Sequence, residues 1–296
     1  MRPDPDAVDF LTIMSTVNVA STVIVFIFGT LIGSFLNVCI YRMPVGRSVV
    51  FPPSACGSCG KQLKWWQNLP IVSYLALQGA CGNCYTPFSP RYAVVETIVG
   101  CLAALLWRHC GGPTYLFFYD FVLFGLVTVV FFVDLDYWII LDSTSLGGMV
   151  AGLVGSMFLP GRAVIELGWL EPIRLGMVPR PVGHLLAAAL GALVGYLFFL
   201  AIASIGAWLA RQEAMGGGDV KFAALIGAFL GWEQAMLSFI LAFWIGGMVA
   251  LPLFLWRGGR KRDPIPFGTF MAVGVVLVVL YGTAITHAAW RFGPYD

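Results

Sequence analysis

The sequence predicts an all-α polytopic membrane protein, with about eight transmembrane helices and a small loop domain between helices 1 and 2. Of its 296 residues, 59% are hydrophobic and only 11% are charged, whereas soluble domains carry about 25% charged residues. Mean hydropathy is +0.86, and a water-soluble fold could not bury that much apolar surface. The same composition excludes intrinsic disorder, so most of the chain must lie in a bilayer.

Eight apolar runs, separated by charged residues, Gly and Pro, give the predicted helices in chain order. A span needs about 20 apolar residues, and the sixth run is the shortest and is interrupted by glycine. The runs centre on Val19–Ile40, Val95–Trp107, Tyr115–Val133, Leu146–Leu159, Leu185–Leu209, Phe222–Leu230, Ala235–Trp256 and Phe270–His287.

The distribution of basic residues sets the orientation of these spans. If the loop after the first span is cytoplasmic, an eight-span path puts eleven of the 17 Lys and Arg residues on the cytoplasmic side, in agreement with the positive-inside rule. The other six are Arg2, Arg108, Arg162, Arg174, Arg180 and Arg291. The N-terminus is then outside and acidic, so the first span does not resemble a cleavable signal peptide.

Three regions follow from this path. Residues 1–41 hold the N-terminus and the first transmembrane helix, residues 42–92 a cytoplasmic domain with four cysteines, and residues 93–296 the remaining transmembrane core. The path brings the stretches Asp134–Asp142 and Gly216–Lys221 to the cytoplasmic face. The loop of about Gly161–Gly183 falls outside and is expected along the membrane interface.

Two CxxC pairs in residues 42–92 predict a structural metal site. Cys56 and Cys59 form one pair, and Cys81 and Cys84 form the other. Thiolates at this spacing on tight turns complete a tetrahedral four-cysteine zinc site, and a metal stabilises a domain too small to build much of a core. A pair of disulfides is the alternative, which the reducing cytoplasm disfavours.

Carboxylates at the ends of apolar spans are costly and therefore mark candidate functional residues. Asp134, Asp136 and Asp142 lie between the third and fourth spans, and Asp219 opens the sixth. Two Asp residues from different helices can share a proton, so that one activates water while the other donates to a scissile carbonyl. Asp134 and Asp219 therefore predict aspartyl proteolysis. The alternative is that these acids are solvated or cap helix ends.

Three residues around Asp219 are candidates for supporting roles. Gly216 and Gly218 permit close approach of a neighbouring segment or of a substrate backbone. Lys221 lies near enough in sequence to influence Asp219 electrostatically or to orient the loop.

Several short motifs occur in a fixed order along nearly the whole chain. They are Gly33-Ser34-Phe35-Leu36-Asn37-Val38, Tyr41-Arg42-Met43-Pro44, the two CxxC pairs, Asn68-Leu69-Pro70-Ile71-Val72-Ser73-Tyr74, Arg91-Tyr92, Val95-Glu96, Glu213 to Lys221, and Pro266-Phe267-Gly268. In this order and spacing, they resemble the motifs of the type IV prepilin peptidase family, the bacterial GxGD-type intramembrane aspartyl proteases.

The resemblance implies that the two catalytic positions fall on Asp134 and Asp219. Asp142 occupies the last Asp of the first motif, where the family has a preceding Pro and this chain has Leu141. Glu96, at the start of the second span, either serves substrate binding or pairs with Arg91 as a structural contact.

The resemblance also implies substrates, partners and location. The substrates are prepilins or pseudopilins with a basic leader, a Gly at the cleavage site and a hydrophobic N-terminal helix. Bifunctional members then methylate the new N-terminus with S-adenosylmethionine. The expected location is the bacterial inner membrane, with a multi-pass chain and an active site that faces the cytoplasm. No nucleic acid partner is expected.

Three other interpretations remain open at the level of sequence. A transporter would place acids near the middle of its spans, whereas these acids cluster at one face. A membrane-anchored zinc module that only recruits partners leaves both acidic motifs unexplained. A peptidase without methyltransferase activity is distinguished from a bifunctional enzyme only by its product.

Overall fold

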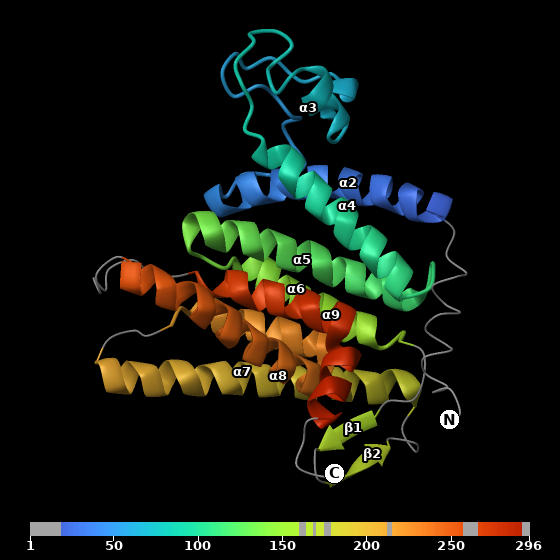
Figure 1. Ribbon diagram of the computed structural model, residues 1–296, viewed down its shortest axis with the longest axis vertical. Helices are drawn as coiled ribbons and strands as arrows, with labels where there is room; N and C mark the ends of the chain where they lie inside the picture. The colour runs from blue at the N-terminus through green and yellow to red at the C-terminus, as the bar shows by residue number, and fades with distance from the viewer. Residues whose placement is uncertain are drawn as a thin grey trace. The chain divides into compact units, whose positions relative to one another are not determined.

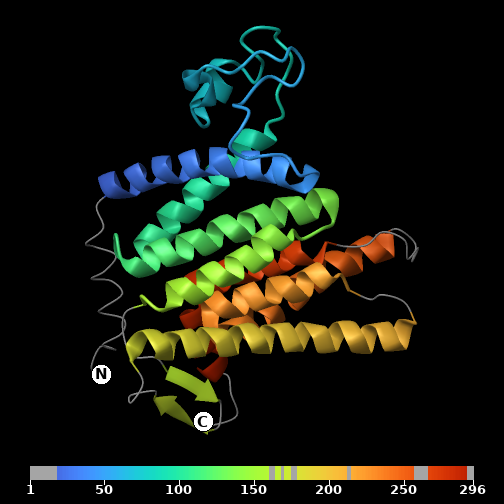
Figure 2. The same ribbon diagram turned by 180° about the vertical axis from the view of Figure 1, so that it is seen from behind.

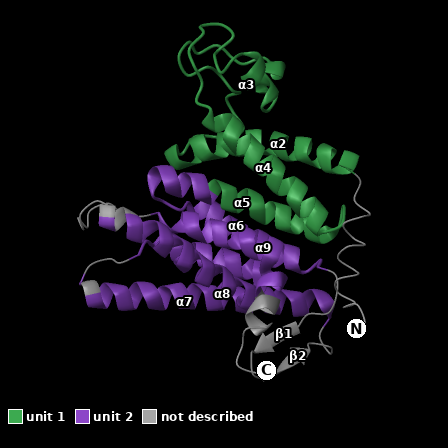
Figure 3. Cartoon of the chain, in the orientation of Figure 1, with its two compact units in different colours: residues 1–129 green, residues 130–296 purple. Residues whose placement is uncertain are grey.

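The computed structural model describes residues 19–159, 164–167, 170–174, 179–211, 215–256 and 266–291. The acidic N-terminus, Trp169 and Glu213 lie outside the described residues. The chain divides into two compact units, Met1–Val129 and Val130–Asp296, coloured separately in Figure 3. The predicted division at residues 41 and 92 stays a prediction, and each unit is described in turn.

Unit 1 is built on the helix pair α2 (Val19–Arg42) and α4 (Arg91–His109). Small residues bring the two helices together, since a Cβ at Gly33 would lie 2.8 Å from the Cα of Glu96. The Asn37 side-chain amide donates to the Tyr92 carbonyl over 3.0 Å. Gly33 and Asn37 of the N-terminal motif therefore join α2 to α4.

The cysteine module, defined as residues 43–90, connects these two helices. It contains the short helices η1 (Met43–Val45), η2 (Trp65–Asn68) and α3 (Val72–Ala76). Figure 1 and Figure 2 both show the module alongside α2 rather than beyond its end. The first part of α5 (Tyr115–Tyr137) completes unit 1, and its last turns begin unit 2.

Unit 2 continues with α6 (Asp142–Ser156), α7 (Arg180–Ala210), α8 (Gly217–Trp256) and α9 (Phe267–Arg291). Strands β1 (Val164–Leu167) and β2 (Leu170–Arg174) pair antiparallel between α6 and α7. This hairpin falls within the loop predicted outside, and it is a small exception to an otherwise helical fold.

Helix α8 reverses direction at Gly231, where φ is 74° and ψ is 171°. The Cβ position of Gly195 on α7 lies 2.5 Å from the Ala223 carbonyl oxygen and 3.6 Å from the Phe239 ring. An uninterrupted helix would separate residues 223 and 239 by about 24 Å. The two halves of α8 therefore fold back on each other beside α7, which explains the glycine interruption in the sequence.

The predicted all-α membrane fold is confirmed. Six helices in the described part of the chain are long and apolar enough to cross a membrane: Val19–Val45, Arg91–His109, Tyr115–Tyr137, Arg180–Leu209, Gly217–Pro252 and Phe267–Ile285. The fourth predicted span corresponds to α6, which has 15 residues. The sixth and seventh correspond to the two halves of α8.

Candidate active site and metal site

The four module cysteines converge on one point. Their Sγ atoms all lie within 4.8 Å of one another, and those of Cys56 and Cys84 are 3.7 Å apart. A tetrahedral site with metal–sulfur bonds of about 2.3 Å has sulfur–sulfur edges of about 3.8 Å. All four are free thiols, so the structure favours the predicted metal cluster over two disulfides.

The two CxxC turns have the same backbone hydrogen bonds. Cys56 N–H donates to the Lys61 carbonyl, and Cys56 C=O accepts from Gly60 N–H. In the second turn, Cys81 makes the corresponding bonds with Thr86 and Tyr85. Gly60 and Tyr85 both adopt positive φ, at 69° and 58°, so two equivalent turns present the two thiol pairs to each other.

Hydrogen bonds to sulfur favour the thiolate form that metal ligation requires. The Thr86 hydroxyl, 3.3 Å from Cys84 Sγ, and the Thr86 backbone N–H together lower the pKa of Cys84 to about 6. The backbone N–H groups of Cys59 and Ser58 lower the pKa of the Cys56 thiol.

Glu96 ties the cysteine module to the helix pair. Its side chain is buried on α4, and its Oε2 accepts a hydrogen bond of 2.8 Å from Ile71 N–H. Ser34 on α2 also hydrogen-bonds to this carboxylate. Ile71 has φ 59°, which is unfavourable for a β-branched residue. The contact joins α4 to the cysteine module, and both the pairing of Glu96 with Arg91 and its part in substrate binding stay predictions.

In unit 2, Asp134 lies buried in the last turn of α5. Trp138 ends this helix with φ 57°, and its N–H donates to the Asp134 carbonyl. Asp134 Oδ2 accepts a hydrogen bond of 2.9 Å from Thr269 N–H in the first turn of α9. A Cβ at Gly268 would lie only 2.9 Å from the same oxygen, so the carboxylate occupies space that a larger residue at position 268 would fill.

Asp219 lies in the first turn of α8 and is brought toward Asp134, close enough for the two carboxylates to interact electrostatically. Its N–H donates to the Gly216 carbonyl over 3.2 Å. A Cβ at Gly218 would lie 2.9 Å from the Cβ of Ile140. The close neighbour of Gly218 is therefore the segment that joins α5 to α6.

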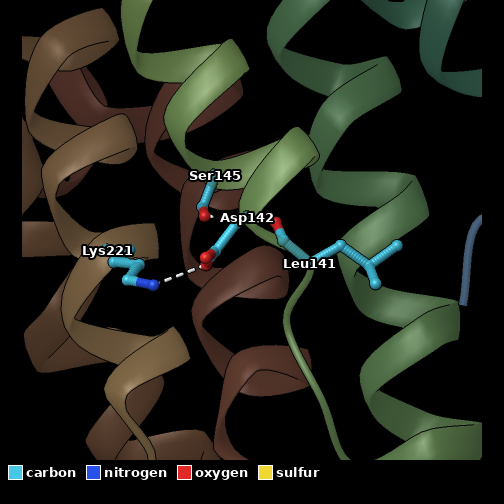
Figure 4. Close-up of polar contacts among 4 residues, drawn as sticks. All are labelled: Leu141, Asp142, Ser145 and Lys221. Carbon is cyan, nitrogen blue, oxygen red and sulfur yellow. Dashed lines mark hydrogen bonds and ion pairs between the residues drawn. The ribbon is translucent and has the colours of Figure 1, made fainter.

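Lys221 pairs with Asp142, as Figure 4 shows, with 2.6 Å between Nζ and Oδ1. This ion pair links the start of α8 to the start of α6. Leu141, at the position where the resemblance leads us to expect Pro, precedes α6 with φ −75° and ψ 133°. Proline fixes φ near this value, so Leu141 keeps the backbone conformation that Pro would impose. Asp136 is exposed.

The structure thus assembles Asp134 and Asp219 from helices far apart in sequence, and it assigns Gly218, Lys221 and Asp142 to contacts that hold their segments together. Sequence reasoning missed the part played by Gly268 and Thr269. The signal was present in the Pro266-Phe267-Gly268 motif, but its contact with Asp134 spans 135 positions.

Two family models match this chain: the bacterial peptidase A24 N-terminal domain over residues 27–110 and the type IV leader peptidase family over residues 121–251. A prepilin leader peptidase/N-methyltransferase of Burkholderia pseudomallei (strain 1026b) is 31% identical over 283 residues, which cover 87% of this chain and 84% of the relative. The chain belongs to the type IV leader peptidase family. It is therefore a multi-pass membrane peptidase.

Two further relatives carry the same name. The Myxococcus xanthus protein is 35% identical over 80% of this chain, which spans 64% of that relative's length. The Pseudomonas aeruginosa protein is 27% identical over 90% of this chain and 92% of its own. No solved structure matches the fold.

Proposed function

We propose that this type IV leader peptidase removes the leader of prepilins or pseudopilins by a two-aspartate mechanism. The observation that carries the proposal is the pairing of Asp134 and Asp219, two carboxylates from different helices that interact electrostatically at the ends of apolar spans. Two such carboxylates act as one titrating unit that shares a proton.

The surroundings of the two acids favour Asp134 as the general base and Asp219 as the general acid. Thr269 N–H donates to Asp134 at the positive end of α9, and both the donor and the helix dipole stabilise an ionised carboxylate. Asp134 then removes a proton from water, the water oxygen attacks the scissile carbonyl carbon, and Asp219 gives its proton to the carbonyl oxygen. Collapse of the intermediate expels the amine of the mature N-terminus, which takes the proton held on Asp134. One hydroxyl of the intermediate returns its proton to Asp219 as the carboxyl group of the leader forms, so both acids regain their starting protonation.

The family implies the substrate and the place of cleavage. The hydrophobic helix of the prepilin enters from the bilayer, and its basic leader stays at the cytoplasmic face of the inner membrane. Cleavage follows a Gly. The orientation rests on the excess of Lys and Arg in the loops on the side of Asp134 and Asp219.

The names of the relatives support a second activity, N-methylation of the new N-terminus. S-adenosylmethionine would supply the methyl group. The bacterial peptidase A24 N-terminal domain model covers α4 and the cysteine module, and we propose that the second activity belongs with this part of unit 1.

The metal proposed for the module is zinc, held by Cys56, Cys59, Cys81 and Cys84. The support is the set of four thiols and their spacing, which fit the edge of a zinc–thiolate tetrahedron. The metal has a structural role, because four protein ligands leave no open position for substrate.

The test uses the full chain in proteoliposomes with a prepilin and S-adenosylmethionine. We expect mass spectrometry to show leader release and one added methyl group on the mature N-terminus. Asp134→Asn and Asp219→Asn should abolish release, whereas Asp136→Asn, which changes an exposed acid in the same segment, should not. An intact prepilin with the wild-type protein would contradict the proposal.

A further inference from the structure

The η2–α3 surface of the cysteine module, defined as Lys61, Lys64, Trp65, Val72 and Leu75, exposes large apolar side chains that closely follow two basic ones in the sequence. Trp65 is 78% exposed, Val72 61% and Leu75 69%. Val72 and Leu75 are three positions apart on α3 and so share one face of that helix. Both lysines are exposed as well. Exposed apolar groups beside basic groups indicate an interaction surface.

The charge of the module restricts what can cover this surface. The segment from Arg42 to Arg91 contains no Asp or Glu, and its basic residues are Arg42, Arg47, Lys61, Lys64 and Arg91. A partner that buries the surface must supply negative charge. The basic leader proposed for the substrate has the wrong sign, so the charge pattern argues against the leader as the occupant.

The module is also held close to the bilayer at both ends. It follows α2 directly and leads directly into α4, and both helices are long and apolar enough to span a membrane. The contacts from Asn37 to Tyr92 and from Glu96 to Ile71 fasten it to the same two helices. Tethering of this kind raises the effective concentration of the surface at the bilayer.

We propose that the η2–α3 surface lies on the membrane itself and takes anionic lipid headgroups. Trp65 sits at the headgroup boundary, where its amphipathic ring is favoured, with Val72 and Leu75 toward the acyl chains and Lys61 and Lys64 among the phosphates. Each Lys near an anionic surface strengthens such binding by on the order of fivefold. The module is thereby oriented by the lipid as well as by its two flanking helices.

The experiment places the full-length protein in nanodiscs of phosphatidylcholine, or of phosphatidylcholine mixed with phosphatidylglycerol, and measures amide hydrogen exchange over residues 61–76. We expect exchange to slow several-fold in the anionic discs only. Raising the salt concentration should reverse the effect. The Lys61→Gln/Lys64→Gln variant should lose the protection, and Arg108→Gln, which removes one charge in the last turn of α4, should keep it.

Bound zinc measured on each variant reports whether the module is still folded, and Lys64→Gln alone provides a milder change if the double variant loses metal. Equal exchange in the two kinds of disc would overturn the proposal. Protection that arises in neutral discs only when a prepilin leader peptide is added would also overturn it, since the surface would then bind protein. None of these outcomes depends on the peptidase mechanism.

Discussion

The cysteine module and the two-aspartate site differ in how the chain assembles them. The four thiols lie within 29 consecutive residues, and two turns with the same backbone hydrogen bonds aim them at one point. The two carboxylates come from α5 and α8, and a third helix, α9, donates to Asp134. The module is therefore a local structure, whereas the aspartate site depends on how closely helices approach one another.

This difference implies that the two sites should fail independently. In the described part of the chain, the close neighbours of the Asp134 and Asp219 segments all belong to unit 2. These neighbours are Gly268, Thr269, Ile140 and Gly218. Changes at helix contacts should stop cleavage and leave bound metal unchanged. Changes at the thiols should release the metal and leave leader cleavage nearly unchanged.

Among changes at helix contacts, the largest effect on cleavage is expected from Gly268→Ala. The new Cβ would lie 2.9 Å from Asp134 Oδ2, so the carboxylate must move, and a displacement of about 1 Å can cost on the order of 10²-fold in rate. Leader-cleavage rates measure the loss. Gly247→Ala on α8 is the control, because nothing lies within 4 Å of its Cβ position. Equal cleavage rates for the two variants would contradict the claim that the contact with α9 positions the Asp134 carboxylate.

A smaller effect, visible in the pH profile, is expected from Thr269→Pro. Proline removes the N–H that donates to Asp134 and is tolerated in the first turn of a helix. A hydrogen bond to a charged group is worth about 1.5–3 kcal/mol, and one pH unit corresponds to about 1.4 kcal/mol. Since the lost donor favours the ionised form, the acidic limb of the rate–pH profile should move up by about one to two units.

Thr269→Val is the matched control for that experiment. It removes the hydroxyl, which bonds the Pro266 carbonyl, but keeps the backbone N–H. The acidic limb should stay where it is in the wild-type protein. A shift of equal size in both variants would mean that the hydroxyl contact, rather than the donor to Asp134, sets the profile.

The ion pair between Lys221 and Asp142 should matter less. Its side chains are 36% and 62% exposed, and exposed pairs contribute about 0–1 kcal/mol. Lys221→Met and Asp142→Asn should each slow cleavage by no more than about fivefold. The exchanged pair Lys221→Asp/Asp142→Lys should recover most of the rate. A double variant that does not recover the cleavage rate would show that Lys221 acts on a group other than Asp142.

The smallest effect on cleavage is expected from loss of the metal. Cys56→Ser should release the bound zinc, measured by elemental analysis, but change leader cleavage by only about two- to fivefold, since sites that share no contact partners are nearly independent. A loss as complete as that expected for Asp134→Asn would instead mean that the folded module takes part in holding the substrate.

Local patterns made most of the fold and the thiol cluster predictable. Apolar runs predict helices because burial follows composition over short windows, and CxxC spacing predicts the thiol cluster because the turns are local. The contacts of Glu96 with Ile71 and of Lys221 with Asp142 were not predicted, since they join residues 25 and 79 positions apart. Lys221 illustrates the limit: proximity in sequence suggested an influence on Asp219 or a role in orienting the loop, and the fold pairs Lys221 with Asp142.

The central claim is that Asp134 and Asp219 work as one unit, and single-turnover leader cleavage by Asp134→Asn, Asp219→Asn and the double variant tests it most directly. Residues that act as a unit show strongly non-additive losses. We predict that each single variant falls by on the order of 10³-fold or more, to the rate of the double variant. A single variant that cleaves well above the rate of the double variant would contradict the account.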